Sequence, residues 1–209
     1  MKKSFFAAIL LSSITFASCS DNSGKHADGT NESHEGMDHC NTDQAATETT
    51  VVVETPDYTS VAAPVKEQIA TLVDSYLKLK DALVETNAET AKKEAQEVLA
   101  AAQKVDVSAL EGDQKSFAEE KLEEVKQSAT KMTEASDVNA QRNNLELLSE
   151  ATFSLTKAFG ATDKKLYYQH CPMANNDQGA YWLSSDNEIR NPYFGDKMLE
   201  CGSTEEVLN

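Results

Sequence analysis

Apolar residues recur at helical spacing from Pro64 to Phe159, and this periodicity is the strongest constraint on the fold. The first segment shows the i, i+4, i+7 spacing of a single buried helix face at Val65, Ile69, Leu72, Val73, Tyr76 and Leu83. Three further segments repeat such a stripe. Pro64 suits the first position of a helix, and Gly160 suits a helix C-terminus. Four amphipathic segments with short connections predict an antiparallel four-helix bundle.

The rest of the 209-residue chain differs in composition from this helical body. We expect a signal peptide at residues 1–18, a flexible tether at 19–60, the bundle at 61–162 and a C-terminal cap at 163–209. The cap has no helical period and is rich in Cys, Met and aromatic residues. The predicted fold class is therefore all-α, a four-helix bundle with a loop-rich cap.

The N-terminal residues have the pattern of an export signal. Lys2 and Lys3 precede an apolar run at residues 5–11, which is too short to span a bilayer. The sequence FASC at 16–19 resembles a bacterial lipobox, although Phe16 stands where leucine is usual. This resemblance implies that Cys19 carries a lipid and that the protein is exported, periplasmic and anchored to the outer membrane. The alternative is ordinary cleavage beside an unrelated cysteine.

The chain is strongly acidic. Its formal net charge is −16, and loss of the two signal-peptide lysines makes it −18. Nucleic acid binding depends on clustered positive charge that neutralises phosphates, and this chain has no such cluster. The composition therefore excludes nucleic acid as a partner.

The tether holds a group of residues that bind soft and borderline metals. It is polar and lacks helical or strand periodicity, which is typical of a flexible segment. Its candidate ligands, of types that copper and zinc favour, are His26, His34, Met37, His39 and Cys40. The Met-Asp-His run resembles copper-binding tracts of periplasmic copper-handling proteins. The hypothesis is a metal-capturing tract; the alternative is a polar tether with incidental histidines.

Other kinds of site find little support in the sequence. No histidine occurs between positions 40 and 169, so the bundle lacks the Glu-x-x-His pairs of carboxylate-bridged metal sites. His170 and Cys171 are neighbours in sequence, which places them poorly for proton transfer as a base and a nucleophile, and no orienting acid is identifiable. We therefore do not expect an enzyme.

The cap contains the second set of metal-ligand candidates. Pro172 holds Cys171 and Met173 in one turn, and Met198 and Cys201 share a face if their segment forms a helical turn. Two thiols and two thioethers together favour a soft monovalent ion, copper(I) or silver(I). His170 is a candidate additional ligand or a supporting hydrogen-bond donor.

A structural interpretation of the same residues competes with the metal site. In an oxidising compartment, Cys171 and Cys201 can form a disulfide that staples the cap. The methionines can fill gaps beneath aromatic side chains. Trp182 and its aromatic neighbours are expected to pack on the end of the bundle.

Four short motifs of the cap resemble a known family. They are CPMA at 171–174, GAYWLS at 179–184, IRNPYFGDKM at 189–198 and CG at 201–202. Together they resemble a Bacteroidetes family of domains of unknown function, over about residues 66–206. Its members occur as small exported proteins and as extensions of periplasmic adaptor subunits of heavy-metal efflux pumps. The first motif also resembles the YxCPMHP core of heavy-metal-binding domains, except that Ala174-Asn175 replaces His-Pro.

The resemblance implies a context of copper and silver handling, with an efflux adaptor or another periplasmic copper-handling protein as partner. Our first hypothesis is a lipid-anchored periplasmic protein that binds copper(I) or silver(I) for sequestration or for transfer to efflux machinery. The alternative hypothesis is an interaction module that docks onto an efflux component, with Cys171–Cys201 as a structural disulfide.

Overall fold

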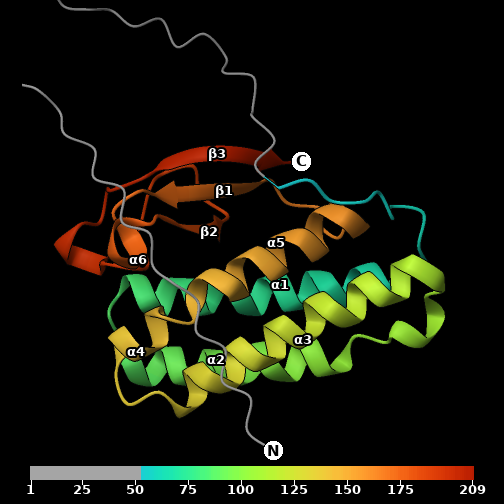
Figure 1. Cartoon of the computed structure of the whole chain (residues 1–209), viewed down its shortest axis with the longest axis horizontal. Helices are drawn as coiled ribbons and strands as arrows, with labels where there is room; N and C mark the ends of the chain where they lie inside the picture. Colours follow the sequence, from blue (N-terminus) through green and yellow to red (C-terminus); the bar gives the residue numbers. More distant parts are fainter. Residues whose placement is uncertain (1–52) are drawn as a thin grey trace, which may run out of the picture. The chain divides into compact units, whose positions relative to one another are not determined.

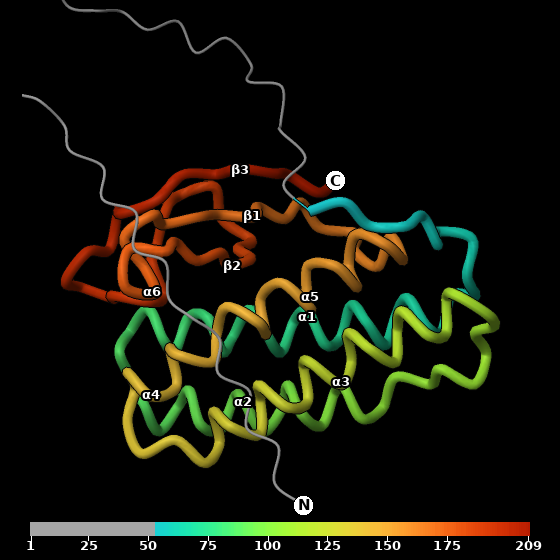
Figure 2. The backbone as a smooth tube through the Cα atoms, viewed as in Figure 1, coloured from blue at the N-terminus to red at the C-terminus, as the bar shows by residue number. Residues whose placement is uncertain are grey.

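The computed structural model describes residues 53–209 (Figures 1 and 2). The predicted signal peptide, Cys19 and the metal-capturing tract lie outside the described residues. The first five helices are α1 Ala63–Val84, α2 Ala88–Lys104, α3 Gly112–Glu134, the short α4 Val138–Arg142 and α5 Leu145–Phe159. The short turns are η1 Val107–Ala109, α6 Ala174–Asp177 and η2 Gly195–Lys197, and the strands are β1 Leu166–Cys171, β2 Ala180–Ser184 and β3 Ser203–Leu208.

The three strands form an antiparallel sheet with the order β2-β1-β3. The expected all-α class with a loop-rich cap is therefore wrong, because the fold combines helices with a sheet. Most of β1 is buried, so its sequence shows no alternation of apolar and polar residues. In addition, β3 joins β1 across residues 172–202, and pairing over such a distance leaves no local signal.

Local signals define the beginnings of the helices. Pro64 lies in the first turn of α1. The side chain of Asn87 accepts a hydrogen bond from the Thr90 N–H at 3.0 Å and so caps α2. Asp137 caps α4 by accepting from the N–H groups of Asn139 and Ala140. These caps satisfy donors that have no partner within the helix.

The fourth predicted helix is divided in two. The short helix α4 ends at Arg142, and α5 begins at Leu145. Asn144, between them, has φ −109° and ψ 4°, which are not helical values. This break turns α4 away from the axis of α5, so that α4 contacts α2 and α3 (Figure 1).

The elements form three layers (Figures 1 and 2). Helices α2 and α3 make the first layer, α1 and α5 the second, and the sheet the third. Strand β2 contacts both α5 and α1, so the sheet lies along the side of this helix pair. The expectation that the aromatic cap packs on the end of the bundle is therefore corrected.

Stacked aromatic rings join the sheet to the helices. The ring of Phe153 on α5 lies 3.9 Å from that of Tyr168 on β1, centroid to centroid, and the two are nearly parallel. Tyr168 stacks in turn on Tyr181 of β2 at 5.0 Å. Phe153 and Tyr168 are both buried. Because aromatic side chains bury a large apolar area, this stack is a principal contact between the sheet and the bundle.

The hydroxyl of Tyr76 connects three elements. It lies 2.6 Å from Ser149 Oγ on α5 and accepts a hydrogen bond from the Leu183 N–H of β2 at 3.1 Å. Burial raises the pKa of Tyr76. Burial raises the pKa of Tyr168 and Tyr193 as well.

We expect the protein to lose stability at alkaline pH because of these tyrosines. Their pKa values are higher in the folded than in the unfolded chain, so their contribution is complete below about pH 10 and is lost as the pH rises further. Each tyrosine contributes a slope of up to about 1.4 kcal/mol per pH unit. Urea unfolding between pH 8 and 11 measures this loss. Tyr76→Phe should reduce the slope, whereas constant stability up to pH 11 would contradict the prediction.

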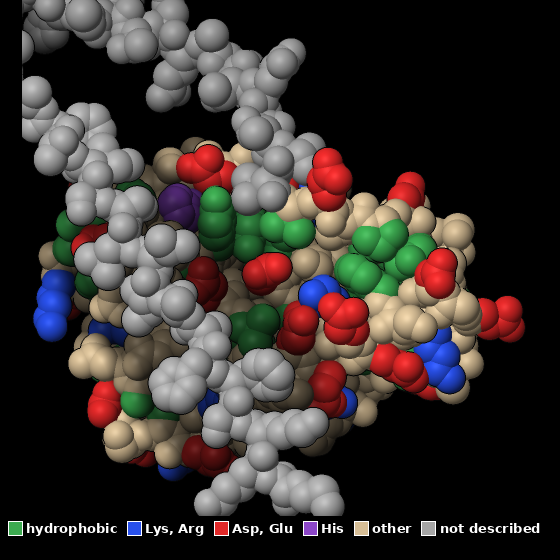
Figure 3. Space-filling model, viewed as in Figure 1, with side chains coloured by type: hydrophobic (Ala, Val, Ile, Leu, Met, Phe, Trp, Pro, Cys, Tyr) green, Lys and Arg blue, Asp and Glu red, His purple; other side chains and the backbone are tan. Residues whose placement is uncertain are grey.

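Among residues 53–209, no helix combines the length and the apolar character needed to cross a membrane. Asp and Glu side chains are scattered over the face drawn in Figure 3, with Lys and Arg between them.

Candidate functional site

Cys171 and Cys201 meet at one end of the sheet. Cys171 is the last residue of β1 and is fully buried, while Cys201 lies just before β3 and is partly exposed. Their Sγ atoms are 2.7 Å apart, and no bond joins them in this structure. Thirty residues separate them in sequence. The structure therefore brings together the two cysteines that the sequence proposed as ligands or as a disulfide.

Asn191 organises the segment that carries Cys201. It is fully buried, and its backbone N–H donates to Leu199 O at 2.8 Å. Its side-chain Nδ2 donates to Cys201 O at 2.8 Å, and its Oδ1 accepts from the Tyr193 N–H at the same distance. The backbone and side chain of Asn191 together bind Tyr193, Leu199 and Cys201. These bonds fix the position of the Cys201 backbone.

Arg142 attaches this segment to the helices. Its Nε donates to Pro192 O at 2.7 Å, and its Nη2 donates to Leu83 O at 2.8 Å and to Thr86 Oγ1 at 3.0 Å. Leu83 lies in the last turn of α1, where the helix dipole favours a cation. Burial lowers the pKa of the Arg142 guanidinium.

Gly195 allows the close approach of the segment to Arg142. It has φ +56°, and a Cβ at this position would lie 2.4 Å from Thr86 Oγ1 and 2.8 Å from Val84 O. Any larger residue would be strained in this conformation and would also clash with the end of α1.

His170 does not join the cysteines. Neighbouring residues of a strand point to opposite faces, so the side chains of His170 and Cys171 lie on different sides of β1. The imidazole instead packs on Tyr181, with ring centroids 4.3 Å apart. Gly179 lies directly against it, because a Cβ there would be 2.4 Å from His170 Nε2.

The two candidate methionines differ in their surroundings. Met173 is 49% exposed. A hydrogen bond from its backbone N–H to the Cys201 sulfur lowers the pKa of that thiol. Met198 is partly buried. The helical turn that would place Met198 and Cys201 on one face does not form, because Met198 has φ −150° and ψ 53°. A single hydrogen bond from the Cys201 N–H to Met198 O closes a non-helical turn there.

The surroundings of Cys201 raise the pKa of its thiol. The hydrogen bond with Cys171 and burial raise the pKa of Cys201 to about 11, while the hydrogen bond from the Met173 N–H lowers it. A metal ion binds the thiolate, so binding must release protons.

The donor set suits a soft ion of low coordination number. Within residues 53–209, no three His, Cys, Asp or Glu side chains come together as a metal site. The cysteine pair therefore offers two thiolates, with the thioether of Met173 following in the same turn. With metal–sulfur bonds of about 2.3 Å, two sulfurs on opposite sides of one ion lie about 4.6 Å apart. Binding thus requires the more exposed Cys201 side chain to move outward.

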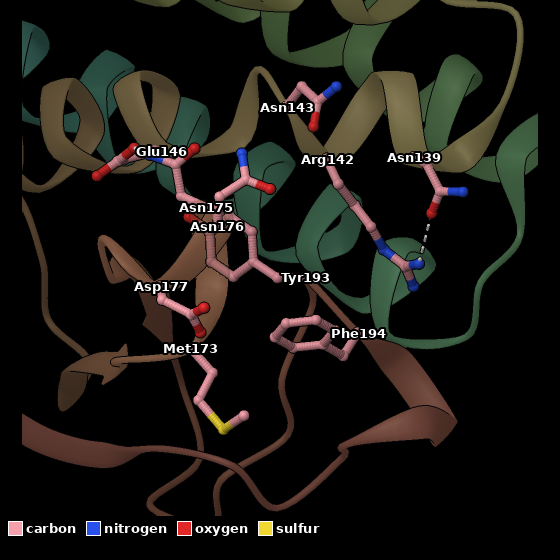
Figure 4. Close-up of a pocket in the computed structure, with 10 residues that line it drawn as sticks. All are labelled: Asn139, Arg142, Asn143, Glu146, Met173, Asn175, Asn176, Asp177, Tyr193 and Phe194. Carbon is pink, nitrogen blue, oxygen red and sulfur yellow. Dashed lines mark hydrogen bonds between the residues drawn. The ribbon is translucent and has the colours of Figure 1, made fainter.

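A pocket of about 260 Å³ lies between the helices and the turns that follow β1 and precede η2 (Figure 4). Arg142 and Glu146 come from the helices, Met173 and Asp177 from the turn after β1, and Phe194 from the loop before η2. The remaining lining residues are Asn139, Asn143, Asn175, Asn176 and Tyr193. The pKa of Glu146 is raised, chiefly by burial and then by Glu150.

Sequence reasoning did not identify this pocket. One wall is a left-handed turn in which Asn175, Asn176 and Asp177 have φ values of 52°, 56° and 63°. Asn and Asp tolerate this conformation better than other residues, so the Asn-Asn-Asp run was a usable signal. The residues that α4 and α5 contribute to the pocket had no comparable signal in the sequence.

Comparison with known proteins finds one family. The model of a family described as "Protein of unknown function (DUF3347)" matches residues 72–164, from within α1 to the loop before β1. The match supports a family of unknown function for the helical part of the chain. It ends before the four cap motifs, so the signature and the association with efflux adaptors stay predictions. No curated protein and no solved structure matches the chain.

Proposed function

We propose that this protein is an exported, lipid-anchored protein that binds copper(I) or silver(I) through Cys171 and Cys201, and passes the ion to an efflux adaptor or another periplasmic copper-handling protein. The observation that carries the proposal is the contact between the two Sγ atoms at 2.7 Å. Thiolates are soft donors that favour copper(I) and similar soft ions. No catalytic role is part of the proposal.

The different exposure of the two cysteines supports reversible binding. Cys171 is buried at the end of a strand, while Cys201 is partly exposed on a loop. A fixed ligand beside an accessible one lets a partner reach the ion from one side. The exposed thioether of Met173 lies in the same turn as Cys171 and offers a weaker soft ligand on that route.

The export signal, Cys19 and the tract at residues 26–40 complete the proposal from the sequence. The lipid would hold the protein at the membrane, and the tract would capture ions from solution. Both lie outside the described residues, so they rest on sequence alone.

Silver(I) titration of the reduced mature chain tests the cysteine pair. The titration uses a background in which His26, His34, Met37, His39 and Cys40 are replaced by alanine, so that the tract does not compete. Loss of a residue that only supports a metal ligand weakens metal binding roughly 10–100-fold. We expect Cys171→Ser and Cys201→Ser each to weaken silver(I) binding by more than this, because each removes a ligand. Met132→Leu, a substitution in the bundle core, is the control and should bind as the background does. Equal binding by the serine variants would refute the proposal.

The same contact also favours the second candidate, an interaction module with a structural disulfide. Sulfur atoms that already touch need little movement to become bonded. Counting free thiols on protein taken directly from its own compartment separates the two functions. A reduced pair supports ion binding, and a blocked pair supports the disulfide.

A further inference from the structure

Trp182 carries a buried hydrogen-bond donor that has no acceptor among the described residues. Its side chain is fully buried on β2, and its Nε1 has no hydrogen-bond partner. A donor that has left water without finding an acceptor destabilises the folded protein, so such groups are rare. The buried indole N–H therefore needs an acceptor that the described side chains do not provide in this structure.

The indole lies beside the cysteine pair. Trp182 belongs to the same buried cluster as Cys171, and Cys201 packs against that cluster. Trp182 is paired with Gln169 on β1, and Cys171 follows two residues later, so all three side chains share one face of the sheet. The Cη2 edge of the indole lies close to Gly202, the residue after Cys201, because a Cβ on Gly202 would lie 2.8 Å from Trp182 Cη2.

Binding of an ion to the pair would create such an acceptor. Two thiols and a monovalent ion give a complex with two sulfur–metal bonds, and both thiol protons pass to solvent. The pair changes from neutral to a net charge of −1. A thiolate is a much better hydrogen-bond acceptor than a thiol, and a buried negative charge requires such a donor.

We propose that the Trp182 Nε1–H donates a hydrogen bond to a thiolate of the ion-loaded Cys171–Cys201 pair, and that this bond is absent when both cysteines are thiols. The inference rests on the proposed function. Trp182 acts through the sulfur and is a positioning residue, not a ligand. Its role is to stabilise the loaded state relative to the empty one.

Gln169 provides the competing explanation for the unpaired indole. Its Oε1 is buried without a donor, and it faces Trp182 across the two strands. A buried water between them would satisfy both groups in every state of the cysteines.

Indole NMR distinguishes these explanations, because the chain has a single tryptophan. The reduced mature chain, labelled with ¹⁵N and carrying the tract-free background, gives one indole N–H signal. We expect this proton to shift downfield when silver(I) is added. A signal that stays in place while silver(I) binds would assign the N–H to water and Gln169, and would overturn the inference.

An isosteric replacement measures the contribution of the N–H. Replacing the tryptophan by β-(3-benzothienyl)alanine exchanges the N–H for sulfur with almost no change of shape. We expect about tenfold weaker silver(I) binding, with an unchanged circular dichroism spectrum. 5-Fluorotryptophan keeps the N–H and is the matched control, which should bind within about twofold of the natural chain.

Failure of the inference and failure of the proposed function give different results. Equal affinity with the benzothienyl residue, in a chain that still binds silver(I), overturns the role of Trp182 alone. If the unsubstituted chain does not bind silver(I), the proposed function fails and the inference fails with it.

Discussion

Arg142→Met is expected to lower the free energy of unfolding by about 3 kcal/mol. The guanidinium donates to Pro192 O, Leu83 O and Thr86 Oγ1, and so joins α4 to the end of α1 and to the loop before η2. Hydrogen bonds from charged donors are worth about 1.5–3 kcal/mol each, and their loss would leave the Pro192 carbonyl without its donor. Methionine keeps the apolar stem of the side chain, so the change reports mainly on these bonds. Urea denaturation measures the effect.

Two further variants make the Arg142 prediction specific. Lysine keeps the charge but cannot reproduce the planar arrangement of donors, so Arg142→Lys should be intermediate. Arg190→Met removes an exposed arginine from the same loop and should change stability by less than about 0.5 kcal/mol. If Arg142→Lys matched the unsubstituted protein, charge alone would explain the role of Arg142.

The Arg142 substitution should also affect the cysteine pair. Pro192 and Gly195 lie in the loop that leads to Cys201, and both contact Arg142. Without this attachment, Cys201 should be alkylated faster by a thiol reagent under native conditions. An unchanged alkylation rate would show that Asn191 alone fixes the position of Cys201.

Phe153→Ala is the second large effect, with an expected loss of about 3–5 kcal/mol. Phe153 is fully buried and stacks on Tyr168 at 3.9 Å, so its truncation leaves a cavity between α5 and the sheet. The ring also lies 5.6 Å from the ammonium of Lys157, a favourable contact that alanine removes. Thermal or urea unfolding measures the total loss.

The position of the damage is also predictable. Because Phe153 supports β1, amide hydrogen exchange should accelerate in the sheet more than in α2. Leu147→Ala, on the same helix but 42% exposed, is the control and should cost less than about 0.5 kcal/mol. Equal acceleration in α2 and the sheet would mean that the molecule opens only as a whole.

The helical body was predictable because its signals are local. The stripe from Val65 to Leu83 is buried in α1 as its spacing predicts. Asp137 and Gly160 mark helix ends through contacts within a few residues. The break at Asn144 was not predicted, because the apolar stripe of α5 fits a single helix that begins after Asp137. Periodicity shows which face is buried, but it does not show where the axis turns.

The candidate site was predictable in its residue types but not in its geometry. The sequence alone determined that Cys171 and Cys201 stand in short motifs beside thioethers and aromatic rings. Only the tertiary structure decided that these two sulfurs touch while His170, the immediate neighbour of Cys171, lies on the other face of β1. The physical reason is the pleat of the strand, which separates neighbours in sequence, and the pairing of β1 with β3, which joins residues far apart in the chain.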